Sequence, residues 1–168
     1  PDPVIQSTLN SARRHLGMKV AYISRIDGDK SHLVYVDAPG FETVIRPGSV
    51  RDLEAVYCQH ILDGRIPALL PDAACHPLTR QMPITHAVPV GAHISVPIRT
   101  RGGEIAFLFC CMDTEANPSL NARDLGVARL FAEIAGAQID LGEEDERQVV
   151  ETRRRMERLV ARKEFSIV

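Results

Sequence analysis

The sequence has 168 residues, of which 45% are hydrophobic and 25% are charged, as expected for one domain with a hydrophobic core. A formal net charge of −2 and a pI near 6.3 argue against a surface specialised for nucleic acid or for an anionic membrane. The longest apolar run, residues 105–112, has the length of a strand and not of a membrane span. We therefore expect neither nucleic acid nor a membrane as a partner.

The first third of the chain predicts a helix followed by a hairpin. Apolar residues recur at helical spacing over residues 4–16, and Gly17 favours the end of that helix. Residues 18–26 then alternate as a strand, Gly28 lies in a turn, and residues 32–36 form a second strand. The two strands should pair as an antiparallel hairpin.

The middle third predicts a helix and a long loop. Ser49 is a candidate N-cap for a helix that ends at Gly64 and whose apolar stripe includes Tyr57 and Ile61. Residues 67–70 have the pattern of a short strand, and residues 72–90 contain several prolines with little periodicity. Long irregular loops of this kind are often functional.

The last third predicts a second hairpin and a long helix. Residues 91–100 alternate as a strand, Gly102 and Gly103 suit a tight turn, and residues 104–112 are apolar on both faces, which is typical of a central strand. Asn121 is a candidate cap for a helix that runs to about Lys163. Hairpins covered by helices indicate an α+β fold and not a doubly wound one.

The order of several loose motifs resembles bacterial GAF domains over residues 1–140. These motifs are residues 57–64 (YCQHILDG), 69–73 (LLPDA), 91–98 (GAHISVPI), 109–113 (FCCMD) and the helix over 125–139. The resemblance implies a GAF/PAS-like six-stranded antiparallel sheet flanked by helices, with a long C-terminal signalling helix. It also implies a pocket between the sheet, the central helix and the long loop, where family members bind cyclic nucleotides, bilins, haem or small metabolites.

Several polar side chains are candidates for the wall of that pocket. On the strand over 91–100, His93 and Ser95 share the face opposite Ile94, so they either look into the pocket or lie on the solvated face of an edge strand. Tyr57 and Ile61 are one helical turn apart and suit either the pocket wall or the core. The full candidate set is Tyr57, His60, Ile61, Cys75, His76, His86, His93 and Ser95.

The cysteines and histidines indicate neither a metal site nor a catalytic residue. Cys58 and His60, with Cys75 and His76, match no standard zinc spacing. Cys75 with His76 also resembles the bilin-attaching cysteine of phytochrome-type GAF domains, but prolines interrupt the helix that should follow, and only 5% of residues are aromatic. The sequence therefore leaves the cofactor, if there is one, unknown. The four cysteines suit reduced thiols and a cytoplasmic protein.

The final helix predicts a signalling role, and the GAF resemblance implies a homodimer through the terminal helices. The seam of the helix, spaced by three and four residues, includes Phe131, Gly142, Val149, Met156 and Leu159, and it weakens near Gly142. The seam alone suits either a dimer or packing within the chain. Arginines beyond residue 152 alternate with acidic residues as on a solvated face. The last residues, with 164–168 reading EFSIV, resemble the entry to an EAL domain, a family that hydrolyses cyclic di-GMP.

These observations predict three parts: a GAF sensor domain over 1–140, a helical linker over 141–163, and the start of an EAL domain at 164–168. The favoured function is a sensor that binds a small molecule and controls a downstream cyclic di-GMP phosphodiesterase in cis, the fragment itself not being an enzyme. One alternative is a ligand-free dimerisation module. A second is a redox enzyme resembling the free methionine sulfoxide reductases, in which Cys75 acts as the nucleophile.

Overall fold

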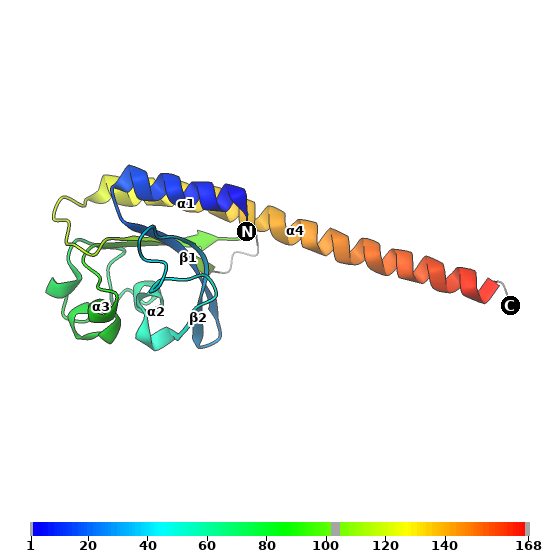
Figure 1. Ribbon diagram of the computed structural model, residues 1–168, viewed down its shortest axis with the longest axis horizontal. Helices are drawn as coiled ribbons and strands as arrows, with labels where there is room; N and C mark the ends of the chain where they lie inside the picture. Colours follow the sequence, from blue (N-terminus) through cyan, green and yellow to red (C-terminus); the bar gives the residue numbers. More distant parts are fainter. Residues whose placement is uncertain (1, 102–104, 167–168) are drawn as a thin grey trace.

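The structure, a computed structural model, describes residues 2–101 and 105–166, and it places a mixed set of helices around one sheet (Figure 1). The predicted turn at Gly102 and Gly103 and the last residues of the predicted EAL entry lie outside the described residues. The helices and strands are, in chain order, α1 (Pro3–Leu16), β1 (Val20–Asp27), β2 (Lys30–Asp37), β3 (Val50–Asp52), α2 (Tyr57–Leu62), β4 (Leu69–Leu70), α3 (Pro83–Ala87), β5 (His93–Arg99), β6 (Ile105–Met112) and α4 (Ala122–Ser166).

Six strands of the described chain form one antiparallel sheet in the order β3-β2-β1-β6-β5-β4. Strand β6 lies between β1 and β5, with Tyr22 of β1 opposite Cys110. Its side chains are buried on both faces, because Phe109 and Leu108 belong to different hydrophobic clusters and are each 0% exposed. The predicted α+β fold and the central position of this strand are confirmed.

The two faces of the sheet are covered by different helices. Figure 1 shows α1 and the first part of α4 side by side on one face, with α2 and α3 on the other. The first face holds the larger core, in which Leu9 of α1, Ile94 of β5 and Ala135 of α4 are fully buried. The second face holds a smaller core around Val20, Tyr57 and further residues of the segments that follow α2. The second part of α4 extends away from the sheet.

Local signals account for the ends of the two long helices. The Asp2 side chain accepts hydrogen bonds from the amides of Val4 and Ile5 at 2.9 and 3.2 Å, which caps α1. At the other end of α1, Gly17 has a φ of 64°, a left-handed conformation that favours glycine. Asn121 accepts from the amide of Arg123 at 2.9 Å and so caps α4, as its position in the sequence predicts.

The predicted helix from Ser49 is wrong in its first part. Residues Val50–Asp52 form β3, which pairs with residues 30–32 at the edge of β2, and α2 begins only at Tyr57. Val56, with φ −119° and ψ 169°, is extended and immediately precedes α2, so the helix cannot begin before it. The unpaired edge of β2 offers hydrogen-bond partners that a sequence window does not reveal, and pairing there replaces helix formation.

The segment over 72–90 is more regular than predicted. It contains two turns of 3-10 helix, Ala73–Cys75 and Thr79–Gln81, followed by α3. Pro83 does not interrupt a helix here, because it occupies the first turn of α3, where its missing amide hydrogen is no loss.

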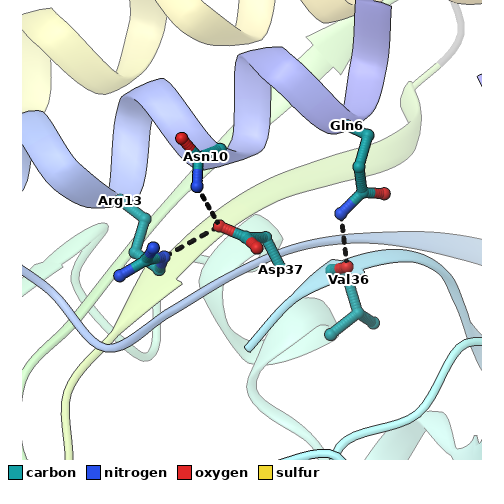
Figure 2. A network of polar contacts seen from close by, with 5 residues as sticks. All are labelled: Gln6, Asn10, Arg13, Val36 and Asp37. Atoms are coloured by element: carbon teal, nitrogen blue, oxygen red, sulfur yellow. Dashed lines mark hydrogen bonds and ion pairs between the residues drawn. The ribbon is translucent and has the colours of Figure 1, made fainter. Parts of the chain in front are cut away.

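A polar network fastens α1 to the outer part of the sheet (Figure 2). Arg13 Nε donates to Asp37 Oδ2 at 2.8 Å, and Asn10 Nδ2 donates to the same oxygen at 3.3 Å. One turn nearer the start of the helix, Gln6 Nε2 donates to the carbonyl of Val36 at 2.8 Å. These contacts fix α1 against the end of β2.

Candidate functional site

A cavity lies on the face of the sheet opposite α1 and α4. Its walls come from β1, β2, β5 and β6, from residues 44–51, and from α2 and α3. The atom-free space between these walls is about 680 Å³ when the open mouth is included, but only about 70 Å³ admits the centre of a water molecule. The interior is therefore a narrow slot with room for a few water molecules.

A buried histidine lines the cavity. His93 begins β5, is 2% exposed, and shares a hydrogen bond of 3.0 Å between its Nε2 and the hydroxyl of Tyr22. The ring of Tyr57 meets the imidazole edge-on at 5.0 Å between centroids. Burial lowers the pKa of His93 to about 4, so the imidazole is neutral near pH 7. Its Nδ1 has no hydrogen-bond partner among the described residues.

A thiol and two hydroxyls form a second polar group on the wall. Cys58 Sγ of α2 lies 3.2 Å from Ser24 Oγ of β1 and 3.9 Å from Ser31 Oγ of β2. Burial raises the pKa of Cys58, and the neighbouring hydroxyls lower it by less. The thiol is therefore protonated near neutral pH, and it acts as a polar contact and not as a nucleophile.

A chain of hydroxyl groups joins α2 to the segment that carries α3. The hydroxyls of Tyr57 and Thr85 are hydrogen-bonded to each other. Thr85 Oγ1 donates to the carbonyl of Thr79 at 2.6 Å, and Thr79 Oγ1 donates to the carbonyl of Ala73, also at 2.6 Å. Both threonines are buried. These contacts hold the segment over 73–87, which contributes Ile84 to the cavity wall, against α2.

The structure brings two of the eight candidate pocket residues to the cavity wall. Tyr57 and His93 line it. Ser95, on the same face of β5, lies deeper and contacts Cys110 Sγ at 3.2 Å. Because His93 and Ser95 are 2% and 0% exposed, the alternative of a solvated strand face is wrong.

The other candidates lie away from the cavity wall. His60 is buried, with its Nε2 3.1 Å from the carbonyl of Glu54, and Ile61 packs in the smaller core. The segment over 73–87 contains the remaining three, Cys75, His76 and His86.

Cys75 is exposed but poorly suited to nucleophilic chemistry. Its Sγ donates to Asp72 Oδ2 at 3.2 Å, and this hydrogen bond and the negative charge of Asp72 raise the pKa of the thiol. All four cysteines are free thiols, and the other three are buried. In the part of the chain that the structure describes, no three histidine, cysteine or acidic side chains are grouped as a metal site would need.

Several residues of the cavity wall are not among the candidates predicted from the sequence, although a local pattern indicates some of them. Tyr22 and Ser24 alternate with apolar residues on β1, and this alternation predicts that their polar groups share one face of the strand. Arg51 lines the cavity because its segment forms strand β3. The helix predicted for this segment did not indicate Arg51 as a wall residue.

The predicted seam of α4 is divided between two environments. Phe131 lies on the inner side, where it packs against the larger core and approaches the ring of His15. Val149, Met156 and Leu159 are 59%, 62% and 56% exposed. The helix is continuous through Gly142, so the weak point in the seam is not a break in α4.

An antiparallel sheet with terminal helices on one face and a cavity on the other is the arrangement implied by the motifs. The GAF domain family matches residues 1–140. The chain belongs to this family. No curated protein matches it. Within the described residues, no helix combines the length and the apolar character that crossing a membrane requires.

Solved structures of sensory proteins share this GAF fold. Residues 122 to 287 of a methyl-accepting chemotaxis protein match at 22% identity and a TM-score of 0.62, over 81% of this chain and 86% of that one. The blue-light absorbing PixJ GAF domain of Thermosynechococcus elongatus matches at 12% identity and 0.69, over 88% and 89%. The chromophore-binding domain of a bacteriophytochrome from R. palustris matches at 14% and 0.63, over 84% and 55%. At these identities the likeness shows the fold alone.

Proposed function

We propose that this GAF domain is a sensor whose cavity binds a small molecule and whose helix α4 transmits the binding event. The observation that carries the proposal is that the cavity and α4 lie on opposite faces of the same two strands. His93 of β5 and Met112 of β6 line the cavity, whereas the adjacent Ile94 and Cys111 belong to the core beneath α1 and α4. A ligand that changes the position of β5 or β6 therefore acts on the helix directly.

Close packing makes α4 sensitive to such changes. Gly136 of α4 approaches β5 so closely that a Cβ built on it lies 2.9 Å from Ile98 Cγ2 and 3.1 Å from the carbonyl oxygen of Arg99. A tightly packed contact does not absorb a shift by deforming, so a displaced strand moves the helix as a body. The ligand changes the output only through its different affinities for the two arrangements.

The proposed output is a cyclic di-GMP phosphodiesterase of the EAL type, placed downstream in the same cytoplasmic protein. Two features support this. The residues at the end of the chain resemble the entry to an EAL domain, and α4 carries the chain away from the sheet (Figure 1). On this proposal the fragment regulates catalysis and performs none itself.

The proposed signalling unit is a homodimer formed through α4. Apolar side chains remain exposed along this helix, including Leu130, Ile134 and Leu141 beside the sheet and Val149 and Met156 beyond it. Exposed apolar residues that recur after about half a heptad or a whole heptad are typical of helices that pack against a second helix. An 8-residue step from Leu141 to Val149, in place of a 7-residue heptad, marks where the seam changes register.

One experiment tests sensing and transmission together. A thermal-shift screen of small metabolites identifies compounds that raise the melting temperature, and spin labels at Arg154→Cys, with Cys75→Ser to prevent labelling elsewhere, report the distance between the two copies of α4. We expect a compound that raises the melting temperature also to change that distance. Binding without any change in distance contradicts transmission, and the absence of a spin–spin distance contradicts the dimer.

The narrow interior favours a second candidate, a ligand-free dimerisation module. About 70 Å³ of interior is below the volume of about 300–1,000 Å³ that is usual for ligand pockets. In this case the screen finds no compound that stabilises the domain, while the spin–spin distance is still observed.

A further inference from the structure

The cavity wall contains a positively charged side chain, that of Arg51. Arg51 of β3 is opposite Ser31 of β2, and residues paired across strands project from the same face of a sheet. Both residues line the cavity, and Arg51 is exposed, which places it at the mouth. Among the described residues no carboxylate pairs with Arg51, whereas its neighbour Asp52 pairs with Lys30. The guanidinium is thus free to meet an anion.

The interior beyond Arg51 is neutral. Burial lowers the pKa of His93 to about 4 and raises the pKa of Tyr22 and of Cys58, so all three groups are uncharged near pH 7. An unpaired charge buried there would lose its hydration without gaining a partner of opposite charge. The unpartnered Nδ1 of His93 is suited to a neutral donor or acceptor instead.

The size of the cavity limits what enters. An apolar cavity of about 150 Å³ holds benzene, and the interior here is smaller, at about 70 Å³, before the mouth is counted. Apolar side chains form most of the remaining wall, among them Leu33, Ile84 and Val88. A body of one ring or a short chain that extends into the mouth matches this shape, and a polycyclic body does not.

We infer that the ligand is a small amphipathic carboxylic acid. Its carboxylate remains at the mouth, paired with Arg51, its apolar body lies between the sheet and α3, and a neutral polar group at the other end reaches His93. The inference rests on the proposed function, because it names the ligand class of the same cavity.

Calorimetric titration with isosteric probes tests the charge at the mouth. The probes are 4-hydroxyphenylacetate, its neutral amide and the cationic 4-hydroxyphenylethylamine, together with a panel of aryl and short-chain acids, each paired with its amide. We expect an acid to bind about three- to tenfold more tightly than its amide, as a partly solvated charged hydrogen bond predicts, and the amine to bind weakest. Added salt should reduce this preference.

Two arginine variants assign the effect. Arg51→Met should reduce the affinity for the acid to that of the amide, whereas Arg14→Met, on the far side of α1, should leave both unchanged. Arg51 and Arg14 are both exposed, so neither variant should impair folding. If amides bind as well as acids, or if Arg51→Met has no effect, the acid is the wrong class and the sensor proposal stands. If no probe or panel member binds, the inference fails, whereas ligand sensing fails only if the thermal-shift screen also finds no compound that stabilises the domain.

Discussion

Replacing Gly136 by alanine tests how closely helix α4 packs on the sheet. The added Cβ lies 2.9 Å from Ile98 Cγ2 and 3.1 Å from the carbonyl oxygen of Arg99. Ile98 is 0% exposed and branched at Cβ, so its methyl group has little freedom to move. The helix must move away from β5, or Ile98 must leave its preferred rotamer. Gly126, on the same helix, has no atom within 4 Å of its added Cβ.

The two substitutions share one effect and differ in another. Alanine in place of glycine stabilises a helix interior by about 1 kcal/mol, and this applies to both positions. Overpacking costs about 1–3 kcal/mol and applies to Gly136 alone. We therefore expect Gly126→Ala to stabilise the domain and Gly136→Ala to be neutral or to destabilise it by up to about 2 kcal/mol. The variants should differ by about 1–3 kcal/mol, or roughly 3–10 °C in melting temperature.

Thermal and urea unfolding of both variants measure this difference. Adding Ile98→Ala to Gly136→Ala removes one of the two close contacts, so the cost of the alanine at 136 should shrink in that background. If Gly136→Ala is as stable as Gly126→Ala in the otherwise unchanged chain, the helix does not approach β5 as described. The proposed route from cavity to helix would then lose its physical basis.

Three further predictions concern charge and thiol chemistry. Burial lowers the pKa of His93 to about 4 from an ordinary 6.5, so between these pH values the unfolded chain binds more protons than the folded protein. The free energy of unfolding therefore falls as the pH falls through this range. Measured by urea unfolding, its decrease from pH 7 to about 5 should be about 2 kcal/mol larger in the parent protein than in His93→Gln. In the folded protein, a thiol reagent should react with Cys75 alone. Asp72→Asn should make this reaction faster, because it removes the charge that raises the pKa of the thiol. Arg13→Met should destabilise the domain by about 1–3 kcal/mol in urea, since it leaves the half-buried Asp37 without its ionic partner.

A matched control separates these effects from general damage. Arg14→Met, at an exposed arginine, should change stability by less than about 0.5 kcal/mol. Equal pH dependence in His93→Gln and the parent would show that the buried histidine does not titrate as described. Reaction of more than one thiol in the folded protein would contradict the burial of the other cysteines.

Elements governed by short-range physics were predictable from the sequence. Helix α1 combines an apolar stripe with Gly17 at its end, and α4 begins at the cap that Asn121 provides. The run over 105–112 is apolar on both sides of the strand, and the structure covers both faces of β6. In each case the residues that decide the conformation lie within a few positions of one another, so a local pattern contains the information.

The candidate site was predictable only in part. Alternation along β5 correctly set His93 opposite Ile94, because side-chain direction in a strand follows from position alone. The partners of His93 come from elsewhere, with Tyr22 on β1 and Tyr57 on α2. Bringing residues 22, 57 and 93 together requires the sheet order, which no local pattern encodes.

What the sequence by itself determined is the family, the α+β class, the central strand and the long final helix, since each rests on periodicity, caps or ordered motifs. Only the tertiary structure decided that residues 50–52 form a strand, because the free edge of β2 supplies their hydrogen-bond partners. The same pairing places Arg51 at the mouth of the cavity. The side of α4 that is buried was also decided by the tertiary structure. An apolar stripe in the sequence indicates which face of a helix is apolar and does not indicate what covers that face.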